Sequence, residues 1–211
     1  MAQAALAPRD TVVDVGAGTG KLTRQLAARG YEVVAVEPIR EMLDVLRRVL
    51  PDVDAREGVA EELPLEDDTA DAITVAQAFH WVDHARAVPE FHRVLKPRGT
   101  VALLWNLRDE RDALQRAYAE LIGPYRGSDY PEPPWTVGLE ESELFSVERR
   151  EFRHDQELDA DGLVARAESV SFVAQLPEDE RAALLERVRA LAPQGTFAFP
   201  YVTKVFTGRA R

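Results

Sequence analysis

One short stretch, TVVDVGAGTGKLT at residues 11 to 23, most restricts the fold that this chain can adopt. It begins with an apolar run, Val12 to Val15, that is interrupted only by Asp14. Glycines follow at alternate positions, and a helix-like pattern begins after them. A strand, a glycine turn and a helix in that order are typical of a nucleotide-type site in an open α/β sheet. Glycine lets the backbone approach a ligand closely, and the amides of the turn and of the helix N-terminus are predicted to face that ligand.

Two better-known phosphate-binding motifs do not fit this stretch. A Walker A loop needs glycine five residues before its Gly-Lys pair and Ser or Thr after it, whereas Val15 and Leu22 occupy those positions here. The dinucleotide fingerprint is G-x-G-x-x-G, whereas Gly16, Gly18 and Gly20 form G-x-G-x-G. The turn is therefore predicted to serve a different nucleotide-like ligand.

The rest of the chain continues the alternation of strands and helices. Apolar periodicity and Gly or Pro breaks predict the elements. Strands are expected at 11–15, 31–36, 53–57, 70–76, 100–105, 144–152 and 199–207, and helices at 19–29, 40–50, 84–95, 109–122, 160–168 and 178–191. The regular alternation lapses over residues 107–143, which we interpret as an insertion after the fifth strand. We expect one domain over residues 1–211, with the insertion covering an acceptor site.

The composition excludes several classes of function. Acidic residues outnumber basic ones by 37 to 26, which gives a net charge of −11 and disfavours nucleic acid and anionic membranes as partners. There is no cysteine, so disulfides, thiolate metal sites and cysteine nucleophiles are excluded. The start of the chain does not resemble a signal peptide, and no apolar run approaches the ~20 residues that span a bilayer. A cytoplasmic location is expected.

Glu37 is the first candidate binding residue outside the glycine turn. It ends the second predicted strand, 17 residues after Gly20. A carboxylate at this place can accept hydrogen bonds from both hydroxyls of a ribose.

Together these features resemble the class I S-adenosylmethionine-dependent methyltransferases. The resemblance lies in V-V-D-V before G-x-G-x-G, in Glu37 after the next strand, and in GVAEELPLEDDTAD at 58–71. It implies a doubly wound, Rossmann-like sheet of seven mostly parallel strands, with helices on both faces and an antiparallel C-terminal strand. It also implies S-adenosyl-L-methionine as the cofactor. The implied cofactor-binding residues are Asp14, Gly16, Ala17, Gly18, Thr19, Gly20, Glu37, Pro38, Met42, Ala60, Glu61 and Gln77.

Some of these roles stay open. By the resemblance Asp14 contacts the turn or, through water, the methionyl amine, while the alternative is that it only braces the turn. The family Asp that binds the adenine amino group is replaced by Val59, so the Ala60 amide or the Glu61 carboxylate would take over. Met42 either packs on the adenine or belongs to the helix core.

The run AQAFHWV at 76–82 follows the fourth strand, at the sheet edge where ligands bind. The resemblance places Gln77 beside the methionyl group, and Phe79, His80 and Trp81 beside the acceptor. His80 could take a proton from the acceptor, or it could cap the next helix or pack on Trp81. No residues have metal-ligand spacing, and no metal is expected.

The resemblance extends to a bacterial subgroup that acts on small molecules, through AQAFHW, WNLRDE and FAFPYVT. It implies a small-molecule methyl acceptor, and we expect a monomer or homodimer. Family members usually carry about thirty residues or more before the glycine motif, and this chain has barely ten. The start is therefore truncated, or the insertion covers the site alone. Two alternatives stay open: an NAD-dependent oxidoreductase on a similar sheet, and a non-catalytic S-adenosylmethionine-binding protein.

Overall fold

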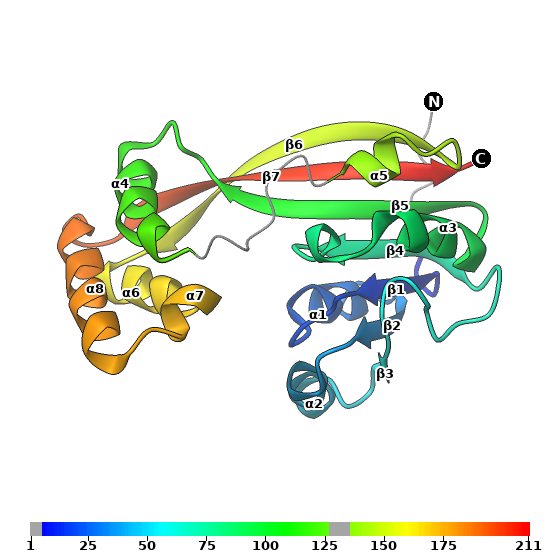
Figure 1. Ribbon diagram of the computed structural model, residues 1–211, viewed down its shortest axis with the longest axis horizontal. Helices are drawn as coiled ribbons and strands as arrows, with labels where there is room; N and C mark the ends of the chain where they lie inside the picture. Colours follow the sequence, from blue (N-terminus) through cyan, green and yellow to red (C-terminus); the bar gives the residue numbers. More distant parts are fainter. Residues whose placement is uncertain (1–5, 127–135) are drawn as a thin grey trace. The chain divides into compact units, whose positions relative to one another are not determined.

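A computed structural model describes residues 6–126 and 136–211. Its seven strands form one sheet in the order β3-β2-β1-β4-β5-β7-β6 (Figure 1). The first five strands pair in parallel, and β7 runs antiparallel to its neighbours β5 and β6 (Figure 1). The predicted fold class is therefore confirmed.

The strands are β1 Thr11–Val15, β2 Glu32–Glu37, β3 Asp54–Glu57, β4 Ala70–Ala76, β5 Leu95–Arg108, β6 Phe145–Leu158 and β7 Phe197–Ala210. The helices are α1 Lys21–Ala27, α2 Arg40–Val49, α3 His84–Val94, α4 Ala113–Ile122, α5 Val137–Glu140, α6 Ala160–Glu168, α7 Ser171–Ala174 and α8 Glu178–Leu191. Two 3₁₀ turns, η1 Phe79–Trp81 and η2 Gly123–Tyr125, complete the described elements. In the part of the chain that the structure describes, no helix is long and apolar enough to cross a bilayer.

The chain forms two compact units. Unit 1 comprises Met1–Trp105, Pro131–Arg150 and Lys204–Arg211, and unit 2 comprises Asn106–Tyr130 and Glu151–Thr203. The predicted insertion at 107–143 contributes to both units. Its residues 127–135, which include Tyr130 and Trp135, lie outside the described residues. The single domain and the covering role of the insertion stay predictions.

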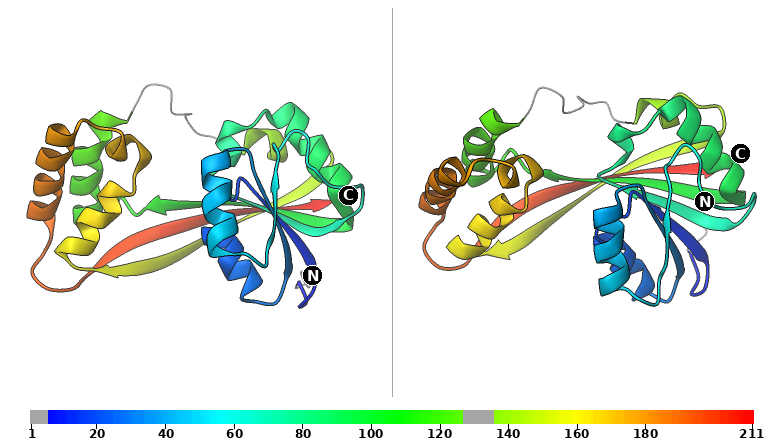
Figure 2. Two further views of the ribbon diagram at one scale, coloured as in Figure 1. Left: turned by 90° about the horizontal axis from the view of Figure 1, so that it is seen from below. Right: turned by 60° about the horizontal axis from the view of Figure 1, so that its bottom comes forward.

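Unit 1 contains the parallel strands. Within it, α1 and α2 lie on one face of the sheet and α3 on the other (Figure 2). Val12 and Val13 of β1 have no exposed surface, as expected for a central strand that is covered on both faces. The carboxyl ends of β1, β2 and β4 consequently meet at one edge of the sheet, where the candidate residues lie.

Unit 2 is built around its helices. Its core includes Tyr118 of α4, Leu163 of α6, Val188 of α8 and Phe199 of β7. The carboxylate of Asp159 accepts a hydrogen bond from the Gly162 amide and so caps α6.

The sequence predicted regular segments better than strand lengths. The helices at 160–168 and 178–191 and the strand at 70–76 match the structure. Strand five was expected over 100–105, but β5 begins at Leu95 and continues to Arg108. β6 and β7 also extend beyond the predicted 144–152 and 199–207. Strand ends depend on partner strands far away in the sequence, which local periodicity does not report.

Candidate functional site

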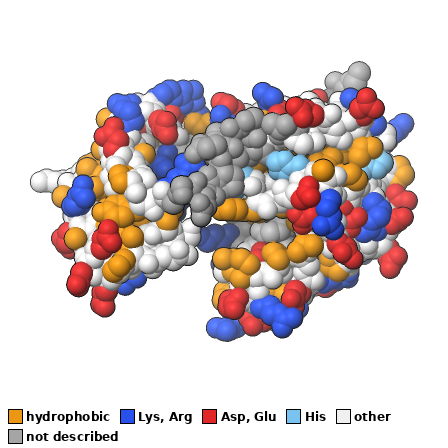
Figure 3. Space-filling view, in the orientation of Figure 1, with side chains coloured by type: hydrophobic (Ala, Val, Ile, Leu, Met, Phe, Trp, Pro, Cys, Tyr) orange, Lys and Arg blue, Asp and Glu red, His pale blue; other side chains and the backbone are white. Residues whose placement is uncertain are grey.

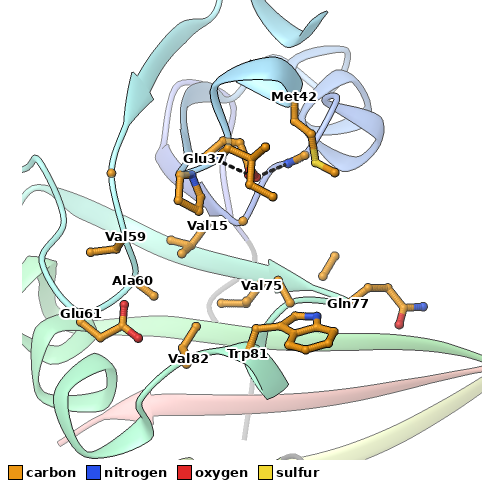
Figure 4. A pocket seen from close by; sticks show the side chains of 17 residues that line it. Val15, Glu37, Met42, Val59, Ala60, Glu61, Val75, Gln77, Trp81 and Val82 are labelled. Atoms are coloured by element: carbon orange, nitrogen blue, oxygen red, sulfur yellow. Dashed lines mark hydrogen bonds between the residues drawn. The ribbon is translucent and has the colours of Figure 1, made fainter. Parts of the chain in front are cut away.

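A cavity of about 570 Å³ opens at the carboxyl ends of β1, β2 and β4 in unit 1 (Figure 4). Its size lies in the range of small-molecule sites. The lining residues are Val15, Gly16, Gly18, Glu37, Pro38, Ile39, Met42, Gly58, Val59, Ala60, Glu61, Val75, Ala76, Gln77, Ala78, Trp81 and Val82. They come from four separate parts of the chain, and nine of the predicted site residues are among them.

The wall of the cavity is largely apolar. Of the six exposed large hydrophobic side chains among the described residues, Ile39, Met42, Val59 and Trp81 line it. Exposed apolar side chains that gather in one concave place indicate a binding site. Figure 3 shows one face of the molecule with its hydrophobic and charged side chains. Met42 is 41% exposed, so it belongs to the cavity wall rather than to the helix core.

Glu37 is the polar centre of the cavity. Its side chain is almost fully buried, yet it lines the cavity (Figure 4). Oε2 accepts a hydrogen bond from the Gly18 amide at 2.7 Å, and Oε1 accepts one from the Ile39 amide at 3.0 Å. Each carboxylate oxygen has room for a second hydrogen bond, because a carboxylate offers about four acceptor positions. Two protein amides therefore fix a carboxylate that can still accept two hydroxyl groups.

The glycine turn contributes open space to the site and does not contribute free backbone amides. The amides of Gly16 and Ala17 both donate to the Val36 carbonyl, at 2.9 and 3.2 Å, and the Gly18 amide donates to Glu37. The expectation that the amides of the turn face a ligand is thus wrong for these three residues. Their donors are already used to join the turn to the end of β2.

Individual glycines have different tasks. Gly18 adopts φ +58°, and a Cβ there would meet nothing within 4 Å. Gly20 adopts φ +86°, and a Cβ there would lie 2.9 Å from Leu50 and 3.2 Å from Leu46. Gly18 therefore keeps space open beside the cavity, whereas Gly20 lets α1 pack on α2. Ala17, Thr19 and Gly20 are not among the lining residues.

Asp14 braces the turn from behind and does not line the cavity. Its carboxylate accepts hydrogen bonds from the hydroxyls of Thr23 in α1, at 2.6 Å, and Thr74 in β4, at 2.9 Å. It also accepts one from the Thr23 backbone. Burial, opposed by these hydrogen bonds, raises the pKa of Asp14 to about 6. The sequence left two roles open for Asp14, and these contacts favour the one in which it braces the glycine turn.

The residues around position 59 that were predicted to contact the adenine also line the cavity. Val59, Ala60 and Glu61 are lining residues (Figure 4). Oε1 of Glu61 accepts a hydrogen bond from the Asp83 amide at 2.7 Å. Part of the Glu61 carboxylate thus holds the residue that caps α3.

The segment after β4 is divided between the cavity and the core. Gln77 and Trp81 line the cavity, and Gln77 has a positive φ of 59°, which is uncommon for a residue other than glycine. Phe79 has no exposed surface and stacks on His84, with ring centroids 4.4 Å apart. His80 is 9% exposed. Neither Phe79 nor His80 lines the cavity, whereas Trp81, the third residue that was predicted to lie beside the acceptor, does. The acceptor contacts of these residues stay predictions.

The reason for this division is the helical turn that this segment makes. The 3₁₀ geometry of η1 sends neighbouring side chains in different directions, so only Trp81 of its three residues is exposed to the cavity. Aromatic composition alone did not indicate which ring faces inward. Nothing in the sequence indicated that Gln77 would adopt a positive φ.

Comparison with known proteins identifies the family of this chain. A family model described as "Methyltransferase domain" matches residues 13–103. An uncharacterized methyltransferase of Mycobacterium tuberculosis is 45% identical over an alignment of 203 positions, which covers 91% of this chain and 80% of that protein. The chain belongs to the class I S-adenosylmethionine-dependent methyltransferases.

A second relative agrees with that assignment, and solved structures share the fold of this methyltransferase. An uncharacterized methyltransferase-like protein of Schizosaccharomyces pombe is 37% identical over 81% of this chain and 68% of its own length. The crystal structure of the YcgJ protein from Bacillus subtilis shares the fold, with a TM-score of 0.63 at 20% identity, over 97% of this chain and 93% of that one. A geranyl diphosphate methyltransferase solved with its S-adenosylmethionine has a TM-score of 0.54 at 16% identity, over 98% of this chain and 79% of that one.

Proposed function

We propose that this methyltransferase binds S-adenosylmethionine in the cavity beside Glu37 and transfers its methyl group to a small-molecule acceptor. One observation carries the proposal: a buried carboxylate, held by the Gly18 and Ile39 amides, lines an otherwise apolar cavity. Such a group can accept both ribose hydroxyls of an adenosyl moiety. The apolar wall then suits the adenine ring.

The residues of the cavity fit the cofactor in three respects. The open space at the Cβ position of Gly18 leaves room for a ligand close to the backbone. Met42 and Val59 offer apolar surface for a planar ring. The charged residues among the described lining are Glu37 and Glu61, both of them acidic, so the electrostatic environment favours a cation such as a sulfonium.

When bound, S-adenosylmethionine supplies an activated methyl group on a sulfonium, which leaves behind a neutral thioether. The chain's part is to bind, align and exclude water, and such positioning supplies much of the acceleration in two-substrate reactions. Glu37 would orient the ribose, and the Pro38, Met42, Ala60 and Glu61 surfaces would hold the adenine. Gln77 would lie beside the methionyl group, and Trp81 would face the acceptor.

Isothermal titration with S-adenosylmethionine and S-adenosylhomocysteine tests the binding step directly. Saturable binding of both at about 1–100 μM is expected, a range of 5.5–8.2 kcal/mol. An absence of binding by both would refute the proposal. Tight binding together with no methylated product from a broad panel of small acceptors would instead support a non-catalytic cofactor-binding protein.

The nicotinamide alternative has less support. The chain belongs to a methyltransferase family, and its glycine spacing differs from the dinucleotide fingerprint. NADH fluorescence during a titration with the protein would reveal such binding. We expect no change.

A further inference from the structure

A buried hydrogen bond links the histidine of the AQAFHWV segment to a distant tryptophan. Nε1 of Trp105, in β5, lies 3.3 Å from Nδ1 of His80, in η1. Both residues belong to unit 1, and both side chains are buried. The contact joins two parts of the chain that are 25 residues apart.

The chemistry of the two rings determines which of them donates the hydrogen bond. An indole N–H can only donate, so Nδ1 of His80 must be the acceptor and must carry no proton. In a neutral imidazole the proton then sits on Nε2. A second proton on Nδ1 would set one N–H group against another at a buried contact, and the donor of Trp105 would lose its acceptor. The bond thus selects one neutral tautomer.

This tautomer disagrees with a role for His80 as a general base. A base needs a free lone pair within hydrogen-bond reach of the acceptor's proton. The lone pair of His80 points to Trp105, and its side chain does not line the cavity.

His80 instead contacts a residue that does line the cavity. The rings of His80 and Trp81 are 5.0 Å apart and inclined by 44°. Trp81 is 62% exposed and lies on the cavity wall (Figure 4). Its backbone amide donates to the Ala78 carbonyl at 3.0 Å, which keeps the indole within one turn of a second lining residue.

Trp105 is in turn held from the C-terminal strand. Its ring forms an edge-to-face pair with that of Phe206 in β7, with centroids 5.8 Å apart and planes at 84°. Edge-to-face aromatic pairs of this kind contribute beyond their buried area. A series of ring contacts therefore runs from β7 through β5 and η1 to the cavity wall.

We propose that His80 and Trp105 are positioning residues: Trp105 fixes His80 as the neutral Nε2–H tautomer, and His80 holds Trp81 against the cavity. Their importance for methyl transfer rests on the proposed function above. No proton passes to His80 in this scheme.

The tautomer can be read from ¹⁵N-labelled protein by NMR, without cofactor or acceptor. The chain has four histidines. His84 serves as an internal reference, because its Nε2 lies 2.9 Å from the Phe79 carbonyl, which can only accept. At neutral pH we expect His80 to show a protonated Nε2, as in His84, and an unprotonated Nδ1. A proton on Nδ1 of His80, in either a neutral or a charged ring, would overturn the proposal.

Variants test the holding of Trp81. His80→Asn keeps an acceptor near the place of Nδ1, whereas His80→Leu removes it, and Trp105→Phe removes the donor but keeps a ring for Phe206. The mobility of the Trp81 indole, from ¹⁵N relaxation of its side-chain N–H, should rise least in His80→Asn, which keeps an acceptor for Trp105 but loses the ring that contacts Trp81, and more in the other two. S-adenosylhomocysteine affinity should fall by about threefold to tenfold in those two, or 0.7–1.4 kcal/mol, and by less in His80→Asn.

Equal effects of His80→Asn and His80→Leu on Trp81 mobility would contradict the proposal. So would an unaltered Trp81 in all three variants. If the unmodified protein binds no S-adenosylhomocysteine, the proposed function fails, but the tautomer and the indole mobility can still be measured. The two failures are thereby distinguishable.

Discussion

The backbone amide of Gly18 donates a 2.7 Å hydrogen bond to Oε2 of Glu37. This bond joins the glycine turn after β1 to the end of β2, across 19 positions of the chain. It fixes a carboxylate at the cavity and simultaneously fixes the turn that keeps the cavity open. The conformation of the turn and the proposed binding of the ribose therefore depend on the same hydrogen bond.

Glu37→Gln should weaken the binding of S-adenosylhomocysteine by about tenfold to a hundredfold, because charge-assisted hydrogen bonds contribute about 1.5–3 kcal/mol. The amide nitrogen of Gln would also face an N–H donor of Gly18 or Ile39. Titration calorimetry measures the change. Glu57→Gln is the matched control: Glu57 also ends a strand, but its side chain is 47% exposed and pairs with Arg40. Equal losses in both variants would argue against a specific role for Glu37.

Gly18→Ala and Gly20→Ala should separate binding from stability. Both glycines have a left-handed backbone, so both variants carry a similar strain of about 1–2 kcal/mol. Only at Gly20 would the new methyl group press on Leu46 and Leu50. We expect the larger loss of stability in Gly20→Ala, by urea denaturation, and the larger loss of cofactor affinity in Gly18→Ala. The reverse order would mean that the two tasks are wrongly assigned.

Asp14 should make stability depend on pH between about 4 and 6. Its pKa is raised from 3.8 to about 6 in the folded protein, so the folded state binds more protons than the unfolded state in this interval. The contribution of Asp14 to stability is therefore favourable at low pH relative to high pH, and it is lost as the pH rises through about 6.

The test compares the unmodified protein with Asp14→Asn, which is neutral at every pH. An Asn amide can still exchange hydrogen bonds with Thr23 and Thr74, because their hydroxyls can also accept. The difference in the free energy of unfolding, variant minus unmodified protein, should be larger at pH 8 than at pH 5 by roughly 1–3 kcal/mol. Free energies of unfolding from urea titrations at the two pH values provide the comparison. A constant difference would show that Asp14 does not titrate in this interval.

Trp81 should report ligand binding through its fluorescence. It lies on the cavity wall and is 62% exposed, whereas Trp105 is 1% exposed and outside the lining. S-adenosylhomocysteine should change the tryptophan emission, and Trp81→Phe should remove most of that change while saturation is still seen by calorimetry. A full emission change in Trp81→Phe would place the ligand away from this wall.

The sequence by itself determined the order of the elements and the position of the site within them. Val12 to Val15, the alternate glycines and Glu37 are local signals, since each depends on a backbone preference or a residue type near in sequence. Those signals located the cavity at the correct strand ends. The helices at 160–168 and 178–191 were likewise predicted from their own residues, and the structure shows Asp159 as the cap of the first and acidic residues in the first turn of the second.

Only the tertiary structure decided which groups remain available to a ligand. The Val36 carbonyl uses the amides of Gly16 and Ala17, and the indole of Trp105 uses the acceptor nitrogen of His80. Phe79 enters the core while Trp81, two residues later, lines the cavity. Each outcome depends on a partner that lies far away along the chain. Folding brings the partners together, and a hydrogen-bonding group that is taken by a buried partner is no longer free for chemistry.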